Sequence, residues 1–173
     1  MRKIAVIGSS GAGKSQLSRS MGEILGLPLI HLDKEYWLPG WTEPPKDEWR
    51  RRVEELVKRE SWVIDGNFGG TMEIRIAAAD TVVFLDLPRS LCVWRTIKRV
   101  ITYRKETRPD MADGCGEQFD PKFLKWIWDF PKNTRPRILE RLAAIEGQKP
   151  FFRLRSRREV ARFLDGLRGE RQA

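Results

Sequence analysis

The chain has 173 residues and a net charge of +9, and 40% of its residues are hydrophobic. This length fits one α/β domain with a full core, and two cysteines with a single histidine are too few for a four-ligand zinc site. No segment approaches the ~20 apolar residues of a membrane span, so we expect a cytoplasmic protein with reduced thiols and no membrane partner.

The first predicted elements are a strand, a glycine-rich loop and a helix. The apolar run 4–7 precedes the loop Gly8–Ser15, whose sequence GSSGAGKS fits G-x-x-x-x-G-K-S. Apolar residues then recur at helical spacing, at Leu17, Met21, Ile24 and Leu25. The glycines let the backbone approach an anion closely, and the loop N–H groups converge at the start of the helix. The sequence therefore predicts a phosphate-binding loop that holds a nucleoside triphosphate.

Within this loop, Lys14 is expected to reach the β- and γ-phosphates, and the Ser15 hydroxyl is expected to ligate Mg²⁺. We take the nucleotide to be ATP and include the residue that follows the loop. The predicted nucleotide-binding residues are Gly8, Ser9, Ser10, Gly11, Ala12, Gly13, Lys14, Ser15 and Gln16.

The second predicted strand covers residues 29–32 and ends at Asp33. In open α/β sheets the ligand crevice lies outside the carboxyl ends of the strands, so Asp33 is well placed to meet a substrate. A helix cap or a turn is the alternative role. The segment 33–60 then forms the acceptor side. Its loop 36–45 is either a substrate cover or a connection whose Trp37 and Trp41 pack on the predicted helix 46–59.

The third and fourth predicted strands, 62–66 and 81–86, each place a carboxylate at the same edge of the sheet. Asp65 is predicted to orient Mg²⁺-bound water beside Ser15, because Mg²⁺ prefers oxygen ligands and keeps several waters. Asp86 is the competing candidate. Because a helix with proline in its first turn follows it, we favour capping or loop anchoring for Asp86.

The second half continues the alternation of helices and strands. A helix over 88–104 is predicted to bury a stripe of apolar residues and to carry Arg95 and Arg99 on one face. The stripe consists of Leu91, Trp94, Ile97, Val100 and Ile101. Residues 104–121 have no periodicity and favour a mobile lid. A helical pattern resumes at Phe123 and is interrupted at Pro131.

The C-terminal part adds a helix that ends at Glu146, a strand over 149–154 and a last helix. Ser156 and Glu159 form a capping box that opens this last helix, and we expect the chain to fray from Gly169. The whole pattern predicts a single domain over residues 1–173, an α/β fold with a five-stranded parallel sheet flanked by helices.

From Ile4 to about Leu167, these features resemble the nucleoside-monophosphate-kinase class of phosphate-loop proteins. The stretch 62–66 is similar to the strand that ends in Asp-Gly in adenylate kinases, 85–88 is similar to their next strand end, and Arg95-x-x-x-Arg99 matches the arginine pair that enters their lid. The resemblance implies that Arg95 lies against adenine and Arg99 lies on phosphate. It also implies that Arg135 or Arg137 adds charge from behind the lid, and that Arg155 and Arg157 border the base.

The chain departs from adenylate kinases after Gly66, where it continues Asn-Phe-Gly instead of Phe-Pro-Arg, and it lacks the monophosphate-side arginine before the third strand. Asp33 instead resembles the acceptor-side aspartate of shikimate-type kinases, whose acceptor is a hydroxyl group. Three stretches, 31–37, 62–67 and 114–117, are most similar to bacterial FlaR-type "topology modulation" proteins.

The leading hypothesis is therefore phosphoryl transfer from Mg-ATP to a small acceptor, with Lys14, Asp33, Arg99 and the arginines 135 and 137 as catalytic residues. The positive charge supports a second hypothesis, an ATP-dependent regulator that acts on DNA, because residues 87–173 have 21 basic and 11 acidic residues. No helix-turn-helix or zinc-finger signature accompanies it, so DNA is not the favoured partner. A nucleotide-binding module without turnover is the third hypothesis. The sequence leaves the acceptor and the oligomeric state open.

Overall fold

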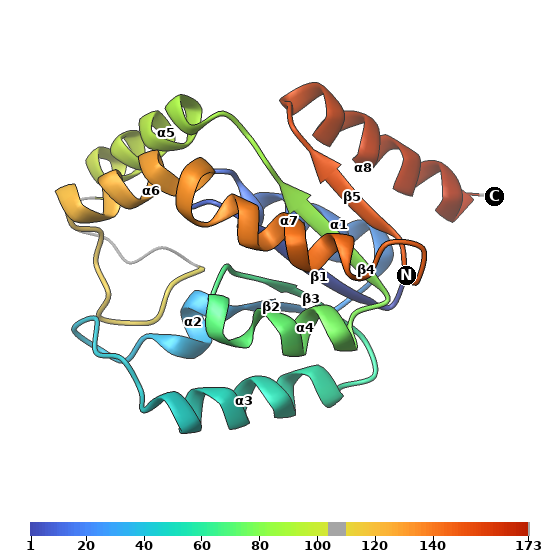
Figure 1. The fold of residues 1–173 in the computed structure, drawn as a ribbon, viewed down its shortest axis with the longest axis horizontal. Helices are drawn as coiled ribbons and strands as arrows, with labels where there is room; N and C mark the ends of the chain where they lie inside the picture. Colours follow the sequence, from blue (N-terminus) through green and yellow to red (C-terminus); the bar gives the residue numbers. More distant parts are fainter. Residues whose placement is uncertain (104–109, 173) are drawn as a thin grey trace.

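Five parallel strands form one sheet in the computed structural model, which describes residues 1–103 and 110–172 (Figure 1). The strands are β1 (Lys3–Gly8), β2 (Leu29–His31), β3 (Trp62–Asp65), β4 (Thr81–Leu85) and β5 (Phe151–Leu154). Their order is β2-β3-β1-β4-β5, so β1 lies at the centre. The predicted five-stranded parallel sheet is confirmed.

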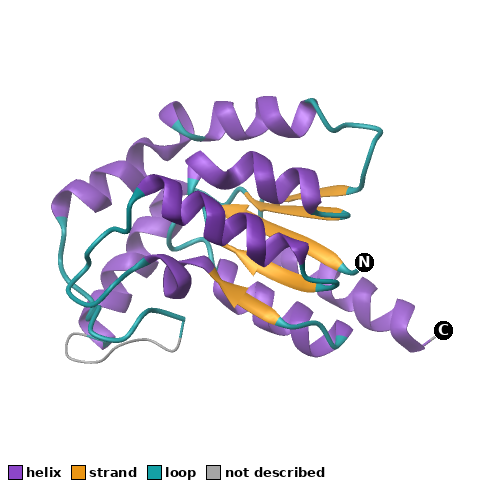
Figure 2. Cartoon of the chain, turned by 90° about the horizontal axis from the view of Figure 1, so that it is seen from below, coloured by secondary structure: helices purple, strands orange, loops and turns teal. Residues whose placement is uncertain are grey.

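Helices connect the strands, as parallel neighbours require, and they cover both sides of the sheet (Figure 2). They are α1 (Lys14–Leu25), α2 (Leu32–Tyr36), α3 (Lys46–Lys58), α4 (Met72–Ala78), α5 (Arg89–Thr102), α6 (Pro121–Asn133), α7 (Arg135–Ala143) and α8 (Arg157–Gln172). A short 3₁₀ turn, Gly69–Thr71, precedes α4.

The core is split between the two faces of the sheet. Along β1, Ala5 and Ile7 belong to one cluster, which includes buried side chains of α3, α4 and α7. Ile4 and Val6 belong to the other, with buried side chains of α1 and α8. All four are fully buried, because successive side chains of a strand point to opposite faces and both faces are covered.

The second strand is shorter than the sequence predicted. It ends at His31, and Leu32, whose side chain is fully buried in the core, opens the short helix α2. Asp33 therefore lies in the first turn of α2 and not at the end of the strand. It still follows the carboxyl end of β2 directly, so it remains at the edge of the sheet where a ligand is expected.

The predicted apolar stripe of α5 is wrong in part, although Leu91 packs partly buried against the core. Trp94 is 54% exposed and Ile101 is 71% exposed, whereas Cys92 and Thr96 are the residues that this helix buries. The reason is the phosphate loop. A Cβ atom added at Gly11 would lie only 2.2 Å from the carbonyl oxygen of Cys92, so α5 packs closely against this loop.

Two boundaries in the C-terminal part also differ from the prediction. Helix α6 does not stop at Pro131 but continues to Asn133, and Arg135 opens α7 only two residues later. Helix α8 extends past Gly169 to Gln172, whereas we expected fraying there. The Ser156 half of the predicted capping box is confirmed, because the backbone N–H of Glu159 donates to Ser156 Oγ at 3.2 Å. The carboxylate of Glu159 accepts from the backbone N–H of Arg155 at 2.8 Å, one residue before the N-cap.

The described part of the predicted lid is packed, although the sequence favoured an unpacked segment; residues 104–109 lie outside the described residues. Met111, Ala112 and Cys115 are buried against Trp37 and Trp41 of the loop 36–45, which we call the aromatic loop. Backbone and side-chain hydrogen bonds also join this loop to residues 114 and 116. Helix α3 buries Trp49, Val53, Leu56 and Val57. None of the described helices is long and apolar enough to cross a membrane.

Candidate active site

The loop Gly8–Ser15 joins the end of β1 to α1, at the edge of the sheet where all five strands end. Gly11 and Gly13 have φ angles of 74° and 97°, a region that side chains rarely adopt. Gly13 is the N-cap of α1, and no side chain caps the first amides of this helix. An anion bound in the loop would satisfy these amides, so the loop fits a phosphate group.

Two cavities adjoin the loop and share four lining residues, Ser10, Lys14, Asp33 and Arg99. The smaller one, about 250 Å³, is lined mainly by the loop, with Gly11, Gly13, Ser15, Gln16, Arg95 and Asp110. The larger one, about 570 Å³, extends between the aromatic loop, the turn after β3 and helices α5 and α6. The two cavities thus meet at the four shared residues, which we call the junction and which include Lys14 and Asp33.

Lys14 lies at this junction, and its Nζ donates a hydrogen bond to the backbone oxygen of Ser9 at 3.1 Å. Burial lowers the pKa of Lys14, the carboxylates of Asp33 and Asp65 oppose this shift, and the guanidinium of Arg99 adds to it. A lysine removed from water in this way gains from an anionic ligand, because phosphate oxygens replace the lost solvation.

Both arginines on α5 line the smaller cavity, and Arg99 also lines the larger one. Arg95 donates from Nη1 to the backbone oxygen of Ala12 at 3.1 Å, so it lies on the phosphate loop. Arg99 pairs with Glu117, with Nε 3.0 Å from Oε1. Glu117 is a residue that the sequence analysis did not assign. It ties Arg99 of α5 to the segment that packs on the aromatic loop.

Asp65 is buried and lines neither cavity. Its Oδ2 lies 2.8 Å from His31 Nδ1, because the two residues end neighbouring strands at the same register position. Burial disfavours the charged form of His31, but the hydrogen bond and the charge of Asp65 outweigh this effect and raise its pKa, with help from Asp110 and against Arg19. Sequence patterns did not indicate this pair, because Asp65 was expected at the end of a strand and His31 was expected inside one.

The raised pKa of His31 predicts how stability depends on pH. The stabilisation by His31 is fully present below the ordinary pKa of 6.5 and is lost as the pH rises through the higher pKa of the folded state. We expect the free energy of unfolding of the parent, relative to His31→Gln, to fall across this range in urea titrations. Because His31 is the only histidine, parallel pH profiles of the two proteins would contradict the prediction.

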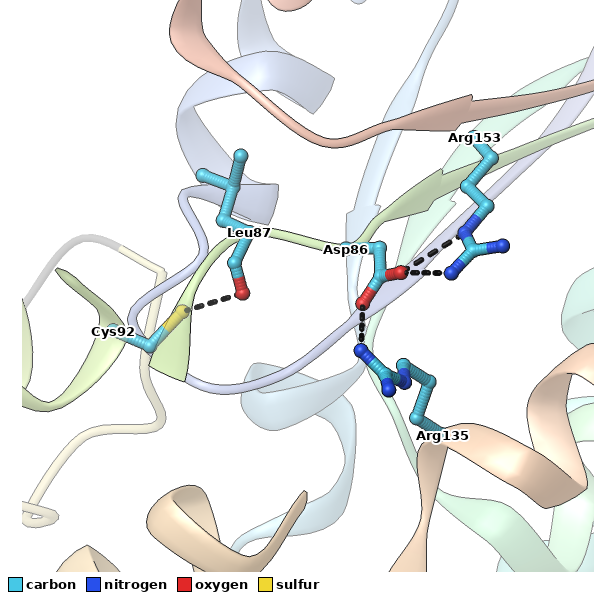
Figure 3. A network of polar contacts seen from close by, with 5 residues as sticks. All are labelled: Asp86, Leu87, Cys92, Arg135 and Arg153. Carbon is cyan, nitrogen blue, oxygen red and sulfur yellow. Dashed lines mark hydrogen bonds and ion pairs between the residues drawn. The ribbon is translucent and has the colours of Figure 1, made fainter. Parts of the chain in front are cut away.

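Asp86 is held by two arginines, in agreement with an anchoring role (Figure 3). Arg153 of β5 donates from Nε and Nη2 to Oδ2, at 2.9 and 2.5 Å, and Nη1 of Arg135 lies 3.8 Å from Oδ1. Asp86 lines neither cavity. Its contacts fix the chain between β4 and α5 to the neighbouring strand and to α7.

Four arginines assigned from the resemblance lie outside the lining of both cavities. Arg135 is engaged by Asp86. Arg137 is exposed because α7 buries Ile138 and Leu142 instead. Arg155 and Arg157 are exposed beside β5, and the charge of Arg157 lowers the pKa of Arg95 after the larger effect of burial. The nucleotide roles of these arginines stay predictions.

The walls of the larger cavity include aromatic residues that sequence patterns did not assign, namely Phe68, Phe119, Phe123 and Trp126. The turn that carries Phe68 is positioned by Arg75, which is fully buried and donates to the backbone oxygens of Gly66, Asn67 and Phe68. Burial lowers the pKa of Arg75 to about 10, and Asp65 opposes the shift. An arginine inside an amphipathic helix gives no sequence signal for this role.

No family model matches the chain. The chain is 28% identical over 129 residues to YqaC, an uncharacterized protein of Bacillus subtilis (strain 168), a match that covers 72% of this chain and 70% of YqaC. Among solved structures, shikimate kinase from Acinetobacter baumannii in complex with shikimate superposes with a TM-score of 0.64, at 19% identity and over 96% of this chain and 90% of that one. This protein has the shikimate-kinase-like P-loop fold.

A gluconokinase from Sinorhizobium meliloti 1021 gives a TM-score of 0.54 at 18% identity, over 99% of this chain and 91% of that chain. At these identities the comparisons establish the fold alone. Solved structures with this fold include small-molecule kinases, and the function of a chain depends on the residues of its site more than on its fold.

Proposed function

We propose that this protein is an ATP-dependent kinase that transfers the γ-phosphoryl group of Mg-ATP to a hydroxyl group of a small acceptor. The observation that carries the proposal is the junction of the two cavities at Lys14 and Asp33. The smaller cavity has the loop amides that suit phosphates, and the larger one has the volume and the mixed apolar and polar walls of a small-molecule site. The resemblance to shikimate-type kinases, through Asp33, supports the same assignment.

Mg²⁺ fits this site through Ser15, which lines the smaller cavity. Asp65 lines neither cavity, but its charge acts on Lys14, and we propose that it also orients metal-bound water. Among the described residues there is no group of three or more His, Cys, Asp or Glu side chains that could hold a metal ion. Mg²⁺ is usually bound by one or two protein groups together with substrate phosphates, and Ser15 with ATP would supply such a site. When bound, the ion would neutralise charge on the phosphates.

The residues of the junction would act mainly by positioning and by charge. The acceptor hydroxyl oxygen forms a bond to the γ-phosphorus, the bond from that phosphorus to the bridging oxygen breaks, and its electron pair leaves with ADP. Lys14 and Arg99 stabilise the charge on the transferring group. Asp33 orients the hydroxyl and takes its proton, or passes it to water as the bond forms.

The test is ADP release from Mg-ATP in the presence of separate pools of hydroxylated compounds, nucleosides and nucleoside monophosphates. Release above the acceptor-free rate with a hydroxylated pool, together with a phosphorylated product in the mass spectrum, supports the proposal. Tight ATP binding without a product from any pool would instead favour a nucleotide-binding module.

We expect Asp65→Asn to lower Mg²⁺-dependent turnover by about 10- to 100-fold, the scale found for groups that support metal ligands. ATP affinity measured without metal should change much less. Asp86→Asn should instead cost about 1–3 kcal/mol of stability, because it removes the anionic partner of Arg153 and Arg135. Mg²⁺ titrations of ADP release and urea unfolding measure the two effects. A larger loss in the Mg²⁺ titration for Asp86→Asn would place the metal carboxylate on β4.

The DNA-associated regulator suggested by the FlaR-type resemblance receives less support. Several basic residues of the second half contact other side chains of the protein: Arg99 pairs with Glu117, Arg135 and Arg153 pair with Asp86, Arg141 pairs with Glu73, and Arg89 lies over the ring of Trp128. Charges held in such contacts are less available to neutralise DNA phosphates. The kinase is therefore the function that we put forward.

A further inference from the structure

The walls of the larger cavity carry information about the acceptor itself. The six aromatic side chains of its described lining come from three separate parts of the chain: Trp37 and Trp41, Phe68, and Phe119, Phe123 and Trp126. A cavity of about 570 Å³ lies within the range of sites that enclose drug-sized molecules. Aromatic walls of this extent favour an acceptor with a flat, apolar body.

The aromatic residues at the start of α6 are incompletely covered. Phe119 is 64% exposed, Phe123 is 36% exposed and Trp126 is 37% exposed. The rings of Phe123 and Trp126 are stacked, with centroids 5.7 Å apart and planes inclined by 6°. A ligand that covers this exposed apolar surface removes it from water, which favours binding of the ligand.

The charged residues of the same walls favour a cation. Four carboxylates line the cavity, Asp33, Glu43, Glu117 and Asp120, whereas Lys14 and Arg99 are the basic residues among the described lining. Arg99 and Glu117 form an ion pair, so their charges offset each other, and Lys14 belongs to the phosphate loop. The carboxylates that remain in the described lining are Asp33, Glu43 and Asp120. Glu43 and Asp120 are exposed and lie on different segments beside the aromatic walls.

Aromatic faces and carboxylates act in the same direction, because the negative face of a ring also attracts a cation. Bound ATP adds further negative charge next to the acceptor. An acceptor with a carboxylate or a phosphate would meet this negative surface, whereas an ammonium group would be attracted by it.

On the basis of the function proposed above, we propose that the acceptor is an aromatic amino alcohol, a molecule with a flat apolar ring, a hydroxyl group that receives the phosphoryl group, and a protonated amine. The ring lies between the aromatic walls. The amine lies near Glu43 and Asp120, and the hydroxyl group points to Asp33 and Lys14.

The test uses four compounds that differ in one property at a time. Phenylethanolamine has the ring and an ammonium group, styrene glycol has the ring and no charge, mandelate has the ring and a carboxylate, and ethanolamine has the ammonium group without the ring. Binding to the protein with a non-hydrolysable ATP analogue and Mg²⁺ is measured by calorimetry, and ADP release from Mg-ATP is measured separately. We expect phenylethanolamine to bind at least about tenfold more tightly than mandelate or ethanolamine.

Matched variants test separately the contribution of the aromatic walls and the contribution of the carboxylates. Trp126→Ala should weaken phenylethanolamine by about fivefold or more, whereas Trp128→Ala, on the same helix but outside the cavity lining, should not. Removing both charges with Glu43→Gln and Asp120→Asn should reduce the preference for phenylethanolamine over mandelate by about three- to tenfold. Asparagine remains a good N-cap for α6, so this change preserves the helix start. The control pair is Glu48→Gln with Asp129→Asn, which removes two exposed or partly exposed carboxylates outside the cavity.

The two readouts separate this inference from the proposed function. Tighter binding of mandelate, equal binding of ethanolamine and phenylethanolamine, or no binding of any of the four compounds overturns the acceptor class. If mandelate is phosphorylated best, the acceptor class is overturned while the kinase proposal stands. If phenylethanolamine binds with the expected preference and no hydroxyl compound releases ADP, the ligand class of the cavity stands and phosphoryl transfer is overturned.

Discussion

Lys14→Ala lowers the rate of phosphoryl transfer by about a thousandfold or more, the scale of cationic groups that stabilise a transferring phosphoryl group. Lys14 lines both cavities and is the charged residue of the phosphate loop. Its Nζ donates a hydrogen bond to the Ser9 oxygen, and burial lowers its pKa in the ligand-free protein. Removing the side chain therefore removes phosphate binding without removing a core contact, and stability should change by no more than about 1 kcal/mol.

Calorimetry with ATP and Mg²⁺, ADP release and urea unfolding measure the three parts of this prediction. Lys34→Ala is the matched control, because Lys34 is an exposed lysine of α2 that lines neither cavity. Parental ATP affinity and turnover in Lys14→Ala would show that the loop does not hold the nucleotide as proposed.

Asp33→Asn should retain ATP affinity within about twofold and lose transfer by about 10²- to 10⁴-fold. Asp33 lies in the first turn of α2, and it lines both the larger and the smaller cavity. An asparagine keeps the size of the side chain but cannot take the proton of the acceptor hydroxyl. Because the transition state of phosphoryl transfer is loose, part of the loss would come from misplacement of the hydroxyl group.

Single-turnover measurements with saturating ATP separate the two effects, because they follow the chemical step after binding. Glu35→Gln is the control, since Glu35 lies on the same short helix, pairs with Arg52 and lines neither cavity. Rapid phosphorylation of a nucleoside monophosphate that is undiminished in Asp33→Asn would remove the role of Asp33 and return the protein to an adenylate-kinase-like activity.

Local sequence patterns determined the fold class and the position of the phosphate loop. The motif Gly8–Ser15 between an apolar run and an amphipathic helix has one established conformation, because its glycines, its lysine and the helix start are adjacent in the chain. Five apolar segments separated by helices likewise specify a parallel sheet, whose strands must all end at the same edge. The fold class and the position of the phosphate loop depend on residues that are neighbours in the sequence, so the sequence was sufficient to predict both.

The tertiary structure alone decided which side chains meet at that edge. Helix α5 buries Cys92 and Thr96 because it packs on the phosphate loop, a contact that its own apolar spacing contradicts. His31 and Asp65 pair because β2 and β3 are neighbours, and Asp86 meets Arg153 because β5 lies beside β4. The aromatic walls of the larger cavity come from segments far apart in the chain. Such contacts depend on the order of the strands and the packing of helices across long sequence separations, which no local pattern records.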